Sequence, residues 1–183
     1  MAFHLPYYAL RSSEVCRRDH RQFENGDSLR DSQDVSFLSR MPCDSSSLLN
    51  HQLSTFLYET QISCVVAGSD EWRWVGYCFV DTYLDPVEGG KETVAQYHED
   101  SSCGGFRGDP FTLGRVEADK PIRDPRIYFL KVLQVRLNQV KNEWQKVVEM
   151  VYQSIRHYEK VCYFSLFFQY KKSRATLGKR RKK

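Results

Sequence analysis

The 183-residue sequence lacks the features that are typical of secreted and membrane-spanning proteins. Its six cysteines stand far apart and form no Cys-x-x-Cys pair, which favours free thiols over a disulfide framework. No basic leader followed by a long apolar run opens the chain, so we expect no signal peptide. No segment reaches the roughly 20 apolar residues that a membrane-spanning helix requires. These absences predict a cytoplasmic protein.

Acidic residues are missing from residues 171–183, which carry eight lysines and arginines. The rest of the chain holds 19 of the 27 basic residues and all 23 acidic residues, so the body is mildly acidic. A body that binds nucleic acid would be expected to be basic. Basic character is therefore concentrated in a C-terminal tail, which ends in Lys179, Arg180, Arg181, Lys182 and Lys183.

Recognisable catalytic and metal-binding signatures are also lacking. Asp81 and Asp85 do not follow the residue spacing of a calcium-binding loop. His98 and Cys103 stand singly, whereas structural zinc sites use closely paired ligands. The glycine-rich segment 104–108 lacks the Gly-Lys-Ser/Thr ending of a phosphate-binding loop. We therefore predict no catalytic residues, no metal site and no cofactor, in a protein that is not an enzyme.

The clearest positive pattern predicts a long helix over residues 124–161. Asp124 can cap the helix and Pro125 suits its first position. Apolar residues then recur in steps of three and four, a seven-residue repeat that places them on one helix face. This predicted interaction face consists of Leu130, Leu133, Leu137, Val140, Trp144, Val147 and Val151. The face can pair with another helix or pack on its own domain. Val148 and Ile155 make it wider than a strict two-position coiled-coil seam, which favours packing on the domain.

The remaining segments predict a smaller body. Residues 1–10 are apolar and aromatic and can pack on the domain as an arm or be unstructured. Residues 11–46 are rich in serine, arginine and aspartate and hold few large apolar residues, so we predict that the region 1–46 is mostly disordered. Residues 47–59 carry apolar side chains at helical spacing and predict a short helix. Two β-prone runs, 61–67 and 72–83, flank a Gly-Ser-Asp turn and predict an aromatic β-hairpin.

These elements predict an α+β fold that is mainly helical, with one aromatic β-hairpin packed with a short helix and a long C-terminal helix. The globular domain spans residues 47–161, and residues 162–183 form an aromatic and then basic tail. Aromatic residues followed by cations are typical of a weak interfacial membrane anchor. A lysine–arginine run is equally typical of a nuclear localisation signal or of an arm that binds nucleic acid.

Three blocks of sequence carry a resemblance to a known family. They are residues 70–74 continuing through 77–83, residues 109–114, and residues 121–130 continuing to Trp144. As a set, these blocks resemble the soluble region of fungal CorA-like magnesium transporter domain proteins. The resemblance covers about residues 55–160.

The resemblance implies a cytosolic domain that precedes transmembrane helices, with a long helix that leads toward the membrane. Because the sequence shows neither pore helices nor a Gly-Met-Asn motif, we expect no magnesium transport by this chain alone. The implied role is a non-catalytic regulatory or interaction domain that self-associates, or pairs with a full-length relative, through the long helix. The alternative is a nuclear or nucleic-acid-associated interaction protein that uses the basic tail. In either case we expect only weak contact of the tail with anionic membranes or nucleic acid.

Overall fold

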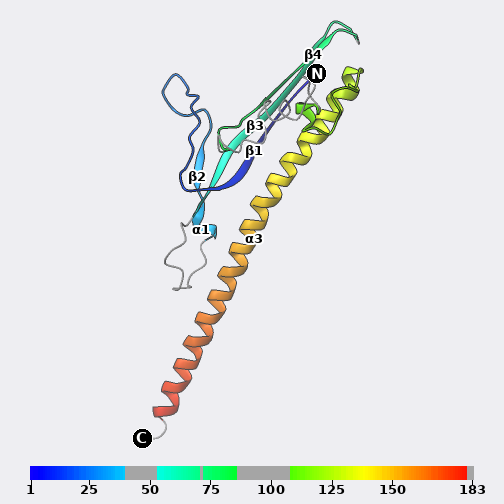
Figure 1. Ribbon diagram of the computed structural model, residues 1–183. Coiled ribbons are helices and arrows are strands. Elements are labelled where there is room, and N and C mark those ends of the chain that lie inside the picture. Colours follow the sequence, from blue (N-terminus) through cyan, green and yellow to red (C-terminus); the bar gives the residue numbers. More distant parts are fainter. Residues whose placement is uncertain (40–52, 71, 86–107, 181–183) are drawn as a thin grey trace.

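The computed structural model describes residues 1–39, 53–70, 72–85 and 108–180, without the side chains of residues 39, 162 and 164–180. Four antiparallel strands form one sheet, and a single long helix lies beside it (Figure 1). The elements in chain order are β1 (Ala2–Ser13), β2 (Ser32–Asp34), α1 (Ser36–Ser39), β3 (Ser54–Gly68), β4 (Trp74–Val80), the 3-10 turn η1 (Pro110–Thr112) and α3 (Pro125–Arg180).

The long strand β3 is the centre of the sheet. Along one edge it pairs with the whole of β1, from Ala2 opposite Val65 to Ser13 opposite Ser54. Its other edge is shared, because β2 pairs with the beginning of β3 and β4 pairs with its end. Two segments that are far apart in the sequence, the N-terminal strand and β3, therefore form the longest ladder of the fold.

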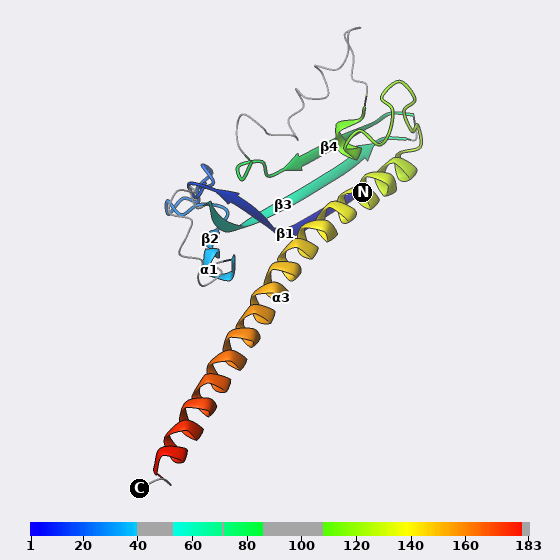
Figure 2. The ribbon, with the colours of Figure 1, turned by 60° about the horizontal axis from the view of Figure 1, so that its bottom comes forward.

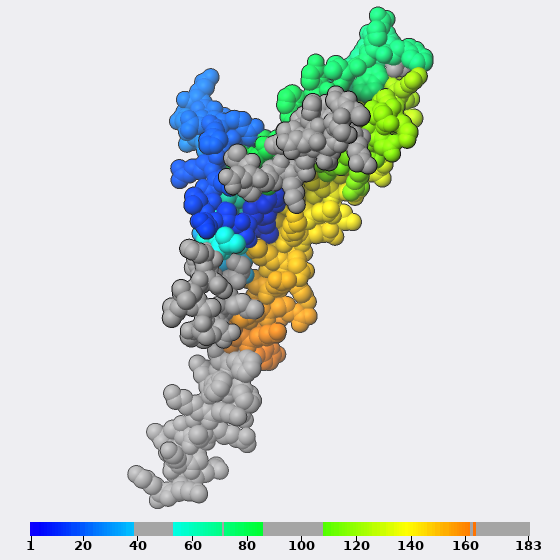
Figure 3. Space-filling model, viewed as in Figure 1, coloured from blue at the N-terminus to red at the C-terminus, as the bar shows by residue number. Residues whose placement is uncertain are grey.

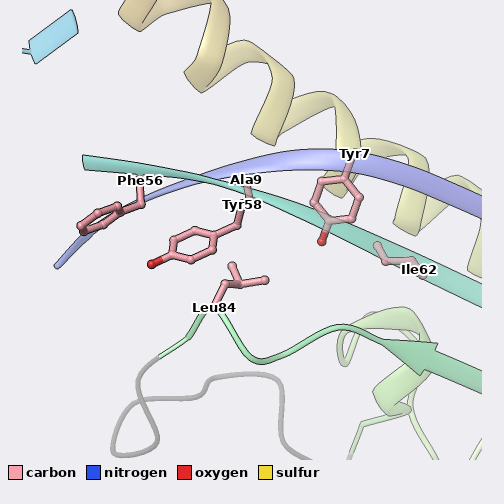
Figure 4. Packing of buried hydrophobic residues seen from close by; sticks show 6 residues of the cluster. All are labelled: Tyr7, Ala9, Phe56, Tyr58, Ile62 and Leu84. Atoms are coloured by element: carbon pink, nitrogen blue, oxygen red, sulfur yellow. The ribbon is translucent and has the colours of Figure 1, made fainter. Parts of the chain in front are cut away.

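The core lies on one face of this sheet. From Phe56 to Val66, β3 alternates buried and half-buried residues, the period of a strand with one face on a core. Figure 4 shows the main cluster converging between β1, β3 and the segment after β4, with the side chains of Tyr7, Ala9, Phe56, Tyr58, Ile62 and Leu84. A second cluster joins the sheet to α3, since Cys64 and Val66 pack with Val132 of the helix.

Helix α3 begins against the sheet and continues past it. Figures 1 and 2 show its N-terminal half beside β1 and its C-terminal half extending beyond the strands. Val132 and Val135 are the buried apolar residues that fix the first half, at 0% and 2% exposure. The 56 residues of α3 span about 84 Å at about 1.5 Å per residue. The predicted helix thus starts where expected but runs on through much of the predicted tail, to Arg180.

The prediction of a mainly helical fold is wrong, because a four-stranded antiparallel sheet supplies the core. The region 47–59 was expected to be a helix, yet β3 starts at Ser54. Region 1–46 was expected to be mostly disordered, yet it contributes β1, β2 and α1. Leu53, Phe56 and Leu57 fit helical spacing, but pairing with β1 outweighs that local preference. This pairing spans more than 40 residues of sequence, so no local pattern announces it.

The predicted β-hairpin is present in the structure. Strands β3 and β4 pair antiparallel as far as Gly68 opposite Trp74. The carboxylate of Asp70 accepts hydrogen bonds from the backbone N–H groups of Trp72 and Arg73, which closes the turn. A Cβ on Gly68 would lie 2.4 Å from the carbonyl oxygen of Arg73, so this close approach requires glycine.

Candidate protein-interaction surface

The N-terminus of α3 is fixed by the cap that the sequence predicts. The carboxylate of Asp124 accepts hydrogen bonds from the backbone N–H groups of Arg126 at 2.7 Å and Ile127 at 3.1 Å. Pro125 occupies the first helical position, where its missing N–H has no intrahelical role. The start of the helix is therefore set locally by two neighbouring residues.

The three blocks that carry the family resemblance meet at this end of the helix. Trp74 of β4 lies 5.2 Å, between ring centroids, from Tyr128 of α3. Its indole N–H donates to the carbonyl oxygen of Arg123 at 3.0 Å. The hydroxyl of Tyr128 donates to the Asp109 carboxylate at 3.1 Å. Burial and this carboxylate raise the pKa of Tyr128, so the phenol stays protonated. The blocks thus form one structural corner that anchors the helix to the sheet.

A buried arginine secures the same corner from the next turns of α3. Arg136 is only 3% exposed, and its guanidinium donates to the carbonyl oxygens of Phe111 and Pro110 at 3.0 and 3.1 Å. It also donates to the side-chain oxygen of Gln139 at 2.8 Å. The turn η1 is therefore held by a charged side chain of the helix. A Cβ on Gly76 would lie 3.1 Å from the Phe111 ring, so β4 also approaches this turn closely.

Arginine–carboxylate pairs hold the middle of the helix. Arg11 of β1 donates to Asp85 at 3.0 Å and to Glu143 of α3 at 2.9 Å. Burial alone would lower the pKa of Arg11, but the two carboxylates outweigh it and leave the pKa raised.

Away from the helix, Asp81 accepts from Arg21 at 2.7 Å and from Arg30 at 2.9 Å. Asp81 and Asp85, whose spacing does not match a calcium-binding loop, are thus both paired with arginines.

The described residues offer little for catalysis. The hydrogen bond with the thiol of Cys78 and, to a smaller extent, burial raise the pKa of Cys64. The thiol of Cys64 therefore stays protonated and does not act as a thiolate nucleophile. No cluster of three histidine, cysteine, aspartate or glutamate side chains in the described ranges could hold a metal ion. His98 and Cys103, which the sequence pattern does not favour as metal ligands, lie outside those ranges. Within the same residues, no helix combines the length and the apolarity that crossing a bilayer requires.

The predicted interaction face of α3 is divided by the structure. Three of its members, Leu133, Val140 and Val147, are half-buried. The other four are more exposed, at 61% for Leu130, 47% for Leu137, 43% for Trp144 and 39% for Val151. The fully buried side of the helix lies further round and carries residues that the seven-residue pattern omitted, including Val132, Val135, Arg136 and Glu143. Sequence reasoning missed this side because two of its four members are charged.

Exposed apolar side chains continue along α3 beyond the predicted members. Ile127 and Val148 are 58% and 63% exposed, and Ile155 and Tyr158 are 54% and 69% exposed. We call eight of these exposed residues the outward stripe; it comprises Ile127, Leu130, Leu137, Trp144, Val148, Val151, Ile155 and Tyr158. Val132 follows Leu130 by two residues, or about 200°, so the stripe and the buried face lie on roughly opposite sides of the helix. In Figure 3 the surface of α3, yellow to orange, forms one border of the molecule.

The edge of the stripe touches the sheet at one place. The Trp144 ring meets the Tyr8 ring of β1 edge to face, with centroids 5.9 Å apart. Further along, α1 lies beside α3, and a hollow of about 840 Å³ between them is lined by Leu38, Met150 and His157 among others. Helix α3 is thus apolar on both sides, with one side already occupied by the sheet and α1.

The basic tail is placed only in part. Lys179 and Arg180 belong to the last turn of α3, while Arg181, Lys182 and Lys183 lie outside the described residues. The structure describes no side chain in this segment, so the role of the tail stays a prediction.

Comparisons with protein-family models, curated proteins and solved structures find no match to this chain. The resemblance to CorA-like domains therefore also stays a prediction, and the candidate site is argued from its geometry alone. That geometry is a long helix, anchored at one end and in its middle by buried polar contacts, with an apolar stripe on its open side.

Proposed function

We propose that this protein is a non-catalytic interaction module whose sheet holds α3 so that the outward stripe can bind another helix. The observation that supports the proposal is the exposure of the stripe, which runs from Ile127 to Tyr158. These 31 residue steps correspond to about 47 Å of helix. Contiguous apolar surface of this extent on a monomer is typical of an interaction site.

The spacing of the stripe indicates the kind of partner. Leu130, Leu137, Trp144 and Val151 are separated by seven residues each, which is the repeat that two supercoiling helices share. A flat or globular partner would not require such a repeat over four turns or more. The partner that fits the stripe is therefore an amphipathic helix that lies alongside α3.

The anchoring contacts support the same role. The buried Arg136 and the pair between Arg11 and Glu143 hold the inner side of α3, so the outer side is presented on a fixed support. Preorganisation of this kind lowers the conformational entropy that binding must overcome. The proposed role of the sheet is to hold α3 in a fixed position.

The family resemblance supports a regulatory setting for this module. In a CorA-like transporter, the resemblance implies that this helix leads to the pore helices. In this chain the same helix would instead serve as a surface for association. Under this proposal the chain acts in the cytoplasm, conducts no magnesium by itself, and works through self-association or pairing with a relative.

Site-specific cross-linking in cells that express the tagged full-length chain tests the proposal. Lys141 is exposed between Leu137 and Trp144, so an amine-reactive cross-linker should join it to another polypeptide held on the stripe. The double variant Leu137→Glu/Val148→Glu should lose these links, because it places two charges in an apolar interface. The matched control Asn142→Glu changes an exposed position on another side of the same helix and should retain them.

An absence of Lys141 links to any second polypeptide in the wild-type chain would overturn the proposed function. Equal links in the wild-type chain and the double variant would also overturn it, because the partner would then sit elsewhere.

A further inference from the structure

We propose that the helix bound by the outward stripe is α3 of a second copy of this chain, running antiparallel to the first. This inference rests on the proposed function and adds the identity and direction of the partner. The two copies would be related by a two-fold axis near the level of residue 146, so that residue n of one copy lies beside residue 292 − n of the other.

The side of α3 that carries the outward stripe contains two rows with seven-residue spacing. The first row is apolar throughout and comprises Leu130, Leu137, Trp144, Val151 and Tyr158. The second row is mixed and comprises Ile127, Gln134, Lys141, Val148 and Ile155. Each residue of the second row precedes one of the first row by three positions, which is the arrangement of the two seam positions of a coiled coil.

A parallel pair would place like residues of the second row together. Lys141 would then face Lys141 of the second copy within the seam, a repulsive contact in a low-dielectric environment. Lys131, which flanks the first row, would face Arg126 of the second copy. The two tails, each with eight basic residues in 171–183, would also run side by side. Charge therefore disfavours the parallel arrangement at three places.

An antiparallel pair removes these conflicts, because each second-row residue meets a first-row residue of the other copy. Lys141 then lies opposite Val151 of the second copy, and its long stem can cover that side chain while the ammonium stays in water. In the same register, Leu137 lies opposite Ile155 of the second copy.

The flanking charges are complementary in the antiparallel arrangement. Lys131 comes within two residues, or about 3 Å along the axis, of the level of Glu159 of the second copy. Both residues directly follow a first-row residue, so both flank the same edge of the seam. The two-fold axis repeats this pair, which gives two lysine–glutamate contacts per dimer.

The area and the shape of the molecule allow such a dimer. The exposed fractions of the eight stripe residues, from 39% to 69%, amount to an area on the order of the 800 Å² that each partner of a standard interface buries. Figure 2 shows the sheet on one side of α3, and Val132 on that side packs against the sheet. Two stripes can therefore meet while both sheets remain outside the contact. No rearrangement of the body is required.

Cysteine cross-linking between two differently substituted chains tests the direction. One full-length chain carries Leu137→Cys and the other carries Ile155→Cys. Under mild oxidation each variant alone should give no more linked dimer than the wild-type chain, which reports the background from its native cysteines. The mixture should give a strong heterodimer band, because the two positions face each other. A strong band for Leu137→Cys alone would mean parallel pairing and would overturn the inference.

Charge reversal tests the register independently. Lys131→Glu should raise the dimer dissociation constant roughly tenfold, because the new glutamate would face Glu159 of the other copy at each of the two symmetric sites. Glu159→Lys should have a similar effect, and the double variant Lys131→Glu/Glu159→Lys should restore the wild-type value. Tighter association of Lys131→Glu would indicate a contact with Arg126 of the second copy, which is the parallel arrangement, and would overturn the inference.

The mass of the wild-type chain separates this inference from the proposed function. Sedimentation equilibrium of the wild-type chain at about 100 μM should show a dimer, and Leu137→Glu/Val148→Glu should be monomeric with unchanged helix content. A monomeric wild-type chain would overturn the second copy as partner. The proposed function would still stand if Lys141 cross-linked to a different polypeptide through the stripe.

Discussion

Single charged residues hold the body together through paired contacts. Asp19 is 4% exposed and accepts from the Arg21 guanidinium at 2.6 Å, and Arg21 also bonds to Asp81. These groups lie between the segment that follows β1 and the segment that follows β4, so they connect parts of the chain that no strand pairing joins. Buried ions of this kind are tolerated because each has a partner of opposite charge.

The pH dependence of stability should show the contribution of Asp19. Burial alone would raise the pKa of Asp19, but the hydrogen bonds and charge of Arg21 outweigh burial and leave the pKa below its ordinary value. The ionised carboxylate therefore stabilises the fold above the unfolded-state pKa of about 3.9, and this stabilisation is lost as the pH falls through the lower folded-state pKa. We expect the melting temperatures of the wild-type chain and Asp19→Asn to differ at pH 7 and to converge as the pH falls through the lowered folded-state pKa of Asp19.

The exposed variant Asp119→Asn is the matched control, and its melting temperature should follow that of the wild-type chain at every pH. A constant difference between wild type and Asp19→Asn down to pH 2 would contradict this account of the aspartate.

The contact between Arg11 and Glu143 should be worth more than a surface pair. The Glu143 side chain is 9% exposed, and its loss would leave the half-buried Arg11 with Asp85 as its remaining carboxylate. We expect Glu143→Ala to lower the free energy of unfolding by about 2 kcal/mol, less than the roughly 3–5 kcal/mol typical of a broken buried pair, because Arg11 is partly solvated. Urea titration measures this loss, and the exposed Gln145→Ala on the same helix should cost less than about 0.5 kcal/mol.

At the scale of elements, the two sides of α3 should respond differently to the same substitution. Val135 is 2% exposed and Leu137 is 47% exposed. Val135→Asp should cost at least about 3 kcal/mol because it buries an unpaired carboxylate, whereas Leu137→Asp should cost less than about 1 kcal/mol in the monomer. Thermal melts measure both, at protein concentrations low enough that the melting temperature no longer depends on concentration. Equal destabilisation by the two variants would mean that the outward stripe is part of the folded core.

The cap of α3 provides a second element-scale prediction. Asp124→Ala removes the acceptor for two backbone N–H groups and should cost about 1 kcal/mol. Asp124→Asn retains an acceptor oxygen at the cap and should recover most of that loss. If neither variant changes the free energy of unfolding, the corner of Trp74 and Tyr128 holds the helix start without help from the cap.

The elements that sequence reasoning found are those that local chemistry determines. Asp124-Pro125 fixes the start of α3, and the turn after Gly68 fixes the β3–β4 hairpin. The pairing of β1 with β3 could not be found this way, because Tyr7 and Ala9 are buried only through contacts with residues about 50 positions later. Pro6 within β1 also weakens any local strand signal, since proline within a sheet is confined mainly to edge strands.

The helix face was misplaced for a different reason. A seven-residue repeat drifts by about 20° per heptad on a straight helix, so an apolar stripe identified by that repeat need not follow the buried face of a single helix. On α3 the sheet selects the side of Val132 and Val135 instead, and the repeat remains on the open side. Pattern alone cannot separate two apolar sides of one helix, and tertiary contacts are needed to decide which is buried.

At the scale of the whole molecule, the outward stripe and the basic tail lie far apart along α3. The outward stripe runs from Ile127 to Tyr158, and the basic residues 171–180 lie at the far end of the helix. In an antiparallel dimer the two ends at Arg180 would be about 100 Å apart, because each is 34 residues from the two-fold axis. Association and tail charge should therefore act independently.

Two variants of the full chain should separate these properties. Deletion of residues 179–183 should abolish retention on duplex DNA and leave the dimer dissociation constant within about twofold, since the tails lie far apart. The uncharged variant Leu137→Ser/Ile155→Ser should abolish the dimer and retain weak DNA binding, with a salt slope of roughly −4 for the five terminal cations. Sedimentation equilibrium and DNA titrations between 50 and 200 mM salt measure both. Tighter dimers after tail deletion would indicate that the tails repel each other, which only a parallel arrangement allows.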